Sequence, residues 1–171
     1  RLGGLALATV ARAGADPALF DQMEAAFGKT EDHHFRAALL AGMVMSRDPA
    51  QRDRTVARLG SGSLTLEELF TLAFVSMSDP TTRAPTWDYL VAHLDEVAAA
   101  LPFLVRPAIV RFAGSFCDAE HRKTVDTVFR AKLEHMPGGT KYLNEALEGL
   151  DLCIARRDKF GADVAAFLEK Q

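Results

Sequence analysis

The chain has 171 residues, of which 49% are hydrophobic and 25% are charged, and its formal net charge is −3. This length is enough to bury a core. The near-neutral charge argues against a nucleic-acid-binding module or a polybasic membrane binder, because both need an excess of Lys and Arg. The hydrophobic content excludes a disordered chain, and no run of about 18 apolar residues could span a membrane. We therefore expect neither nucleic acid nor a membrane as a partner.

The choice of apolar residues indicates an all-α chain. The sequence has 28 Ala and 21 Leu but only 2 Ile and 11 Val. Ala and Leu lose little freedom in a helix, whereas β-branched residues are typical of strands. Because the sequence begins at Arg1 without a Met, we interpret it as a part of a longer chain. Cys117 and Cys153 are too few for a disulfide framework and leave the compartment open, with the cytoplasm slightly favoured.

Three dipeptides, Asp16-Pro17, Asp48-Pro49 and Asp79-Pro80, each predict the start of a helix. The Asp side chain can accept hydrogen bonds from the free amides of the first turn, and Pro has no amide to leave unpaired there. The three pairs lie 32 and 31 residues apart, and a fourth start at Asp118 follows after 39 residues. Spacings of roughly 30 to 45 residues are typical of paired-helix repeats.

The helices predicted in chain order span residues 2–13, 17–27, 31–45, 49–59, a segment from 65 onward, 86–100, 107–116, 118–135 and 140–170. Thr65 and Glu68 form a predicted capping box, and we expect the charged cluster 156–159 to mark a bend or a short break. With short connections, these helices should pack as antiparallel neighbours. The sequence thus predicts one domain over 1–171, a right-handed, HEAT-like α-solenoid of about nine or ten helices.

Apolar residues at helical spacing indicate which side chains face the core, and the single tryptophan, Trp87, is expected to anchor two helices. These predicted core residues include Phe35, Leu39, Leu40 and Met43, and Trp87, Leu90, Val91, Leu94 and Val97.

No catalytic signature is present: the sequence has no His-Glu-x-x-His, no Gly-x-Ser-x-Gly and no phosphate-binding glycine loop. His33 and His34 are adjacent, so in a regular helix they point about 100° apart and cannot bind one ion together. Cys117 and His121, four residues apart, could share a metal only if two more ligands came from elsewhere. A buried cysteine and a solvated histidine are the simpler interpretation. We predict neither catalytic nor metal-binding residues in this segment.

Two arginines, Arg106 and Arg111, interrupt the most apolar segment of the chain, residues 103–116. A guanidinium group there must extend to the surface, pair with a carboxylate or face a wet cavity. On a concave surface an arginine could hold a peptide carboxylate through two hydrogen bonds. Arg106 and Arg111 are therefore the candidates for lining a substrate cavity.

Several motifs in the second half of the chain occur in an order typical of one enzyme family. The run Arg83 to Leu90 (RAPTWDYL) resembles a helix with the pattern Arg…Trp-x-Phe/Tyr-Leu, and Arg111 to Asp118 (RFAGSFCD) resembles a Phe-(Cys/Ser)-(Thr/Ser/Asp) junction. A helix with Val125 and Phe129 and a closing pair of apolar runs follow. This order resembles the C-terminal helical domain of gluzincin zinc aminopeptidases, of the aminopeptidase N and endoplasmic-reticulum aminopeptidase type. Ile154-Ala155-Arg156 departs from the family's Asn-x-x-Trp.

The resemblance implies a bowl-shaped helical stack that closes over a thermolysin-like catalytic domain and helps to select peptides. It places the zinc ligands and the catalytic glutamate in that other domain, so this segment would have no cofactor and no activity of its own. Its partners would be the catalytic domain of the same parent chain and peptide substrates. The alternative is a free-standing HEAT-like scaffold for partner proteins. A small metal or redox protein that uses Cys117 and His121 is a third hypothesis.

Overall fold

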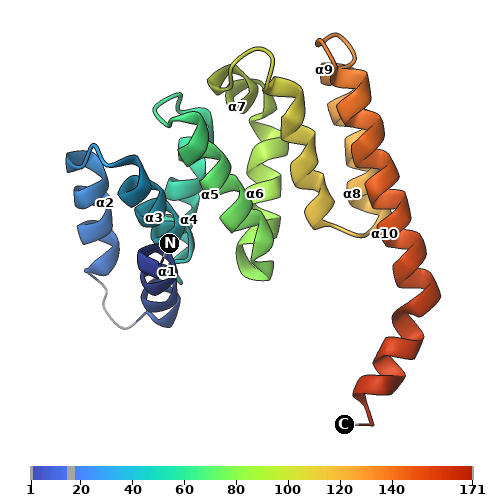
Figure 1. Cartoon of the computed structure of the whole chain (residues 1–171), viewed down its shortest axis with the longest axis horizontal. Helices are drawn as coiled ribbons and strands as arrows, with labels where there is room; N and C mark the ends of the chain where they lie inside the picture. The colour runs from blue at the N-terminus through green and yellow to red at the C-terminus, as the bar shows by residue number, and fades with distance from the viewer. Residues whose placement is uncertain (1, 15–17, 171) are drawn as a thin grey trace. The chain divides into compact units, whose positions relative to one another are not determined.

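The structure, a computed structural model, describes residues 2–14 and 18–170, with the backbone alone for residues 2–5. This part of the chain contains ten α-helices, two 3₁₀ helices and one π-helical turn, and no strand (Figure 1). The predicted all-α stack is confirmed. The chain divides into two compact units, unit 1 (Arg1–Pro102) and unit 2 (Phe103–Gln171). None of the described helices is long and apolar enough to cross a membrane.

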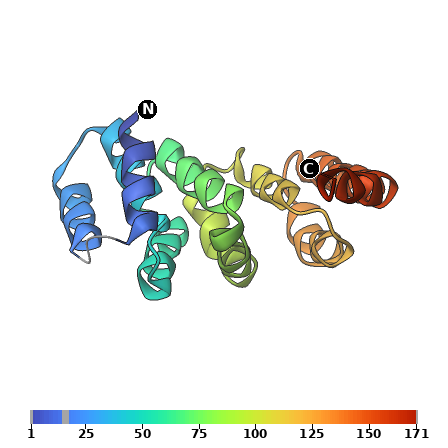
Figure 2. The same cartoon turned by 90° about the horizontal axis from the view of Figure 1, so that it is seen from below.

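Unit 1 is built around helix α3, which contacts α1, α2, α4 and α5, while α5 packs on α6. Figure 2 shows α4 and α6 on the same side of the layer that α3 and α5 form. The helical elements of this unit are α1 (Leu2–Ala13), α2 (Leu19–Lys29), α3 (His33–Val44), α4 (Pro49–Val56), the 3₁₀ helix η1 (Ala57–Gly60), α5 (Leu66–Ser78), α6 (Pro80–Ala92) and α7 (Leu94–Ala100).

The helix starts predicted from Asp48-Pro49, Asp79-Pro80 and the Thr65 capping box are confirmed. The Asp48 carboxylate accepts from the Ala50 amide at 2.9 Å, and that of Asp79 accepts from the Thr81 amide at 2.8 Å. Thr65 caps α5 through the full capping box with Glu68. The first Asp-Pro pair, residues 16–17, lies outside the described residues. Local capping chemistry thus sets where α4, α5 and α6 begin.

The predicted single helix over 86–100 is wrong in two respects: the helix begins earlier, and it is interrupted. Helix α6 begins at Pro80 and runs through Pro85, although Pro85 has no amide to donate to the preceding turn. The helix then breaks at His93, whose φ of −116° and ψ of 29° lie outside the helical region, and α7 follows. Neither the tolerated proline nor the break at His93 is encoded in the apolar spacing.

The core of unit 1 matches most of the predicted apolar positions. Leu40 and Met43 are fully buried and Trp87 is 4% exposed, but Phe35, expected on the same stripe, is 45% exposed. Gly42 lets α1 approach α3 closely, because a Cβ there would lie 3.0 Å from Leu7 Cβ and 2.7 Å from Met23 Sδ. Phe35 lies in the first turn of α3, where neighbouring helices do not cover it.

Unit 2 contains the 3₁₀ helix η2 (Arg106–Ser115), α8 (Ala119–Thr124), the π-helical turn η3 (Val125–Phe129), α9 (Arg130–Leu133) and α10 (Gly139–Leu168). Helix η2 packs on α10 and buries Pro107, Ala108, Ile109, Val110, Phe112 and Ala113, whereas Phe103 and Leu104 at the start of the apolar segment are 56% and 74% exposed. The segment forms a 3₁₀ helix instead of the predicted α-helix. Asp118 caps α8. Together α8, η3 and α9 cover most of the predicted helix over 118–135.

Helix α10 is continuous across residues 156–159, so of the bend or short break predicted there, the short break is wrong. Its start depends on two glycines: Gly138 has φ of +75°, and a Cβ on Gly139 would lie 1.8 Å from the Leu133 carbonyl oxygen. Leu143 and Leu150 in its first half are fully buried. The second half runs past α8 (Figure 1). The handedness of the stack and its organisation as one domain stay predictions.

Candidate functional site

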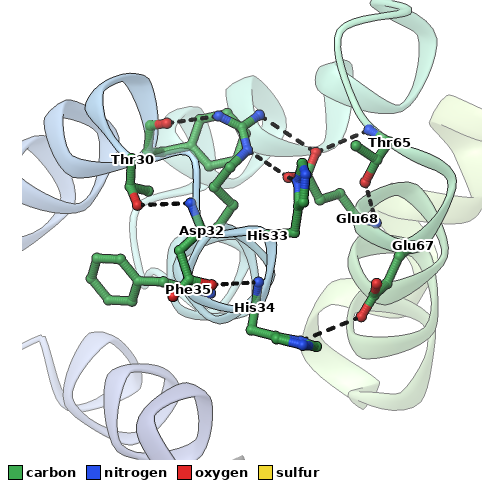
Figure 3. A network of polar contacts seen from close by, with 10 residues as sticks. Thr30, Asp32, His33, His34, Phe35, Thr65, Glu67 and Glu68 are labelled. Carbon is green, nitrogen blue, oxygen red and sulfur yellow. Dashed lines mark hydrogen bonds and ion pairs between the residues drawn. The ribbon is translucent and has the colours of Figure 1, made fainter.

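The most connected polar cluster of unit 1 lies where the first turns of α3 and α5 meet (Figure 3). Its centre is Glu68, whose side chain is completely buried. Arg36 donates from Nε to Oε1 at 2.5 Å and from Nη2 to Oε2 at 3.4 Å. The Thr65 amide donates to Oε2 at 2.9 Å. One carboxylate thus caps α5 and holds α3 at the same time.

Arg36 extends the cluster to α2. Its Nη1 donates to the Phe27 carbonyl oxygen at 2.9 Å, and its guanidinium carbon lies 3.9 Å from the centre of the Phe27 ring. Arg58 lies 5.0 Å from the centre of the same ring. A buried charge is tolerated only when hydrogen bonds and an opposite charge replace water. Arg36 and Glu68 meet this condition for each other.

The electrostatics of the cluster keep Glu68 ionised. Burial alone would raise the pKa of Glu68, but the hydrogen bond from Arg36, that from the Thr65 amide and the Arg36 charge together hold this pKa below its ordinary value of 4.5. A carboxylate with a lowered pKa and every oxygen occupied is a poor general acid or base near neutral pH. The arrangement joins three helices and supplies no proton-transfer chemistry.

His33 and His34 turn toward different carboxylates. His33 Nδ1 lies 3.6 Å from Glu68 Oε1, and His34 Nδ1 lies 3.7 Å from Glu67 Oε1. Their side chains are 63% and 90% exposed, as expected for a polar helix start. Residues 2–14 and 18–170 include no group of three or more His, Cys, Asp or Glu side chains placed to hold a metal ion. Zinc therefore does not fit this cluster.

The two arginines proposed from sequence both lie on η2. Arg106 is half-buried, with its guanidinium carbon 5.7 Å from the centre of the Phe103 ring. Arg111 is 58% exposed; it lies 4.7 Å from the centre of the Tyr142 ring and 3.5 Å from Glu145. In a 3₁₀ helix, residues five apart point about 120° away from each other. The structure therefore does not bring Arg106 and Arg111 to a common point.

Cys117 and Cys153 form a disulfide with a Cα–Cα distance of 5.3 Å. This corrects the interpretation of Cys117 as a buried single cysteine and removes the hypothesis that Cys117 and His121 bind a metal, since a disulfide sulfur is not a thiolate ligand. The sequence offers little signal for the pairing, because the two cysteines lie 36 residues apart and only tertiary structure brings them into reach.

His121 belongs to a small cluster at the start of α8. Its ring stacks on Phe116 with centroids 3.5 Å apart, and its Nδ1 lies 2.7 Å from the Asp118 carboxylate. Burial alone would raise the pKa of Asp118, but hydrogen bonds from the His121 amide and ring lower it below its ordinary value. Asp118 therefore orients His121 in addition to capping α8.

Two arginines connect this region to α10 beside the disulfide. Arg157 Nη1 donates to the Cys117 carbonyl oxygen at 2.7 Å. Arg122 forms a two-pronged ion pair with Asp151, at 2.5 and 3.0 Å. Hydrogen bonding from the Arg122 guanidinium, together with the positive charge of Arg122, lowers the pKa of Asp151. The middle of α10 is thus fixed to the start of α8 by one covalent bond and two charged contacts.

A comparison with known protein families found a family model that matches this chain. The family model described as "ERAP1-like C-terminal domain" matches residues 2–152. The chain belongs to this family. The resemblance drawn from the motifs between Arg83 and Leu168 is therefore confirmed at the level of the family. No curated protein and no solved structure matches the chain. The ERAP1-like match ends at Leu152, inside α10, and does not include the rest of that helix.

Proposed function

We propose that this chain is the C-terminal helical domain of a zinc-dependent aminopeptidase, in which it encloses the active-site chamber and shapes the access of peptides. The match to the ERAP1-like C-terminal domain over residues 2–152 carries this proposal. The all-helical architecture agrees with it. The clusters around Glu68 and Cys117 support a structural domain, because their polar groups are engaged in joining helices.

In this proposal the zinc ion and the catalytic residues belong to another part of the parent enzyme. The two histidines of α3 diverge and both cysteines are in the disulfide, so we place no reaction step on this chain. Its partners are the catalytic domain of the same parent chain and the peptides that enter the chamber.

Arg106 and Arg111 are the proposed contacts to peptide. Each guanidinium group lies over an aromatic ring, and Arg111 has only a long contact of 3.5 Å to Glu145, which leaves its donors available to a ligand. A planar guanidinium that rests on a ring is well placed to hold a carboxylate. We propose that Arg111 binds the free carboxyl end of a peptide in the chamber and that Arg106 contacts the peptide at another point.

The residues encoded before Arg1 test the overall proposal. A His-Glu-x-x-His motif with a second Glu about one helix later, and a Gly-x-Met-Glu-Asn loop, are expected there in an aminopeptidase of this type. Further helical repeats in their place would favour the free-standing scaffold. The purified 171-residue chain should not hydrolyse an aminoacyl anilide in the presence of zinc, and zinc-dependent hydrolysis by it would contradict the proposal.

The role of the arginines needs the parent enzyme. Arg111→Ala should lower kcat/KM about tenfold for peptides with a free carboxyl end, because a charged hydrogen bond contributes roughly 1.5–3 kcal/mol. Hydrolysis of the same peptides with an amidated end, and of an aminoacyl anilide, should be unchanged. Arg130→Ala is the matched control, since Arg130 is also exposed and pairs with Asp126 four residues earlier, in the adjoining turn η3. Equal losses for free and amidated peptides would refute the carboxylate contact.

A further inference from the structure

The second half of α10 exposes a row of large apolar side chains. Phe160 is 49% exposed, Val164 55% and Phe167 62%, whereas Leu143 and Leu150 in the first half are fully buried. Apolar side chains that are grouped on one face, and not scattered singly, mark interaction surfaces. This segment also lies beyond the ERAP1-like match, which ends at Leu152. Its surface therefore calls for an explanation of its own.

Five residues define this face, and we call it the α10 face: Leu152, Arg156, Phe160, Asp163 and Phe167. At 3.6 residues per turn, these positions fall within an arc of about 80° on the helix. An open groove of about 610 Å³ runs along this part of α10, with Leu152, Arg156 and Phe160 in its lining. Such a narrow stripe with an adjacent groove is suited to packing against another helix.

The α10 face is held in place before any partner arrives. The disulfide joins Cys153 to Cys117, and Arg157 donates to the Cys117 carbonyl oxygen at 2.7 Å. Helix α10 is continuous from Gly139 to Leu168. A partner therefore does not have to order this segment, and a small interface can suffice because the entropic cost of ordering is already met.

Two charges on the α10 face have no ion pair or hydrogen bond within the part of the chain that the structure describes: Arg156 and Asp163. The neighbouring charges are engaged, since Arg157 binds Asp158 and Lys159 lies over the Phe160 ring. Arg156 and Asp163 are seven residues apart, about 10 Å along the helix, so they cannot pair with each other. One basic and one acidic group thus flank Phe160 on the same stripe.

We propose that the α10 face binds the α10 face of a second copy of this chain, with the two helices antiparallel. A two-fold axis beside Phe160 makes the stripe self-complementary, because residues equally distant from the axis meet across it. Arg156 then faces the partner's Asp163, and Leu152 faces the partner's Phe167, each twice. The two Phe160 rings meet near the axis.

The charge order determines the direction of the pairing. In a parallel pair, Arg156 would face the partner's Arg156, and Asp163 the partner's Asp163, which is unfavourable. A single helix face makes a small interface, so the dimer should be weak, with a dissociation constant of the order of 10–100 µM.

Sedimentation velocity of the 171-residue chain over a range of concentrations tests the proposal. The native chain should dimerise, while Arg156→Asp or Asp163→Arg alone should weaken the dimer about tenfold or more, because each variant places two like-charge pairs across the axis. An equimolar mixture of the two variants should dimerise again, since both facing pairs then have opposite charges. The loss in each single variant distinguishes the antiparallel pair from a parallel one, in which the native chain itself would already place two like-charge pairs across the axis.

Asp158→Arg is the matched control, because it changes the same amount of charge on the opposite side of the helix and should dimerise like the native chain. Circular dichroism should show unchanged helix content in all three variants, which alter exposed residues. A native chain that stays monomeric up to about 500 µM would overturn the proposal. Single variants that dimerise normally, or a mixture that stays monomeric, would overturn it as well. Any of these results would leave the α10 face to a different occupant.

Discussion

The two units hold their helices together by different means. In unit 1 the charged pair Arg36 and Glu68 joins α2, α3 and α5, with Glu68 completely buried. In unit 2 the disulfide between Cys117 and Cys153 joins the start of α8 to α10. The first device depends on ionisation and on both partners being present, and the second depends on oxidation. They should therefore fail under different conditions.

The difference follows from how much each unit can bury. Helix α3 is surrounded by four other helices, so a charged pair beside it is shielded from water. The buried residues of α10 all lie in its first half, and no charged side chain of unit 2 is buried in the part of the chain that the structure describes. A small unit with little core gains more from a covalent link than from another surface contact.

Loss of the disulfide should be the largest effect. Replacing both cysteines by serine should lower the stability of unit 2 by about 3–4 kcal/mol, because the bond closes a loop of 36 residues. Hydrogen exchange should speed up in α8 and the middle of α10 and stay unchanged in α3 and α5. Treatment of the native chain with a thiol reductant should reproduce this pattern. Equal acceleration in both units would contradict the comparison.

Loss of the ion pair between Arg36 and Glu68 should lower the stability of unit 1 nearly as much as loss of the disulfide lowers that of unit 2. Arg36→Met leaves the Glu68 carboxylate buried without its counter-charge and should cost about 3 kcal/mol in urea unfolding. Adding Glu68→Leu to this variant should restore part of the loss, because no unpaired charge remains. The ion pair between Arg122 and Asp151 is the control. Asp151→Asn should change stability far less, since Asp151 is 52% exposed. An Arg36→Met variant as stable as Asp151→Asn would show that the buried pair is not needed.

Lowering the pH should destabilise unit 1 through Glu68, with a smaller effect than the substitutions above. The folded pKa of Glu68 is below 4.5, so its contribution is complete above pH 4.5 and is lost as the pH falls through the folded pKa. Glu68→Gln should remove this part of the pH dependence in unit 1. Asp79, whose pKa is lowered mainly by the Thr81 hydroxyl, remains in both proteins and serves as an internal reference. Identical acid unfolding profiles for native and variant chains would refute the role of Glu68.

Local features of the fold were predictable because their causes lie within a few residues. The caps at Asp48, Asp79 and Thr65 follow from side chains that bind amides two or three positions away. Burial of Trp87 follows from apolar periodicity. The break at His93 was missed, because the apolar spacing continues across it. Propensity and periodicity alone do not report such a change in backbone direction.

The contacts that characterise the candidate site could not be predicted, because they join distant positions. Arg36 and Glu68 lie 32 residues apart, and the two cysteines 36. Arg111 could be singled out as a charge within an apolar segment, but its neighbour Glu145 lies 34 residues away. In each case the sequence indicates that a partner is needed, and only the packing of helices decides which one is used.

The turn before α10 restricts how this family member can vary. A Cβ at position 139 would overlap the Leu133 carbonyl oxygen, and that oxygen is backbone, which cannot rotate away. Gly28 and Gly114 have open space where a Cβ would be. In a library of all single substitutions, position 139 should accept glycine alone, while 28 and 114 should accept many residues. Three glycines that look alike in the sequence thus differ widely in evolutionary freedom.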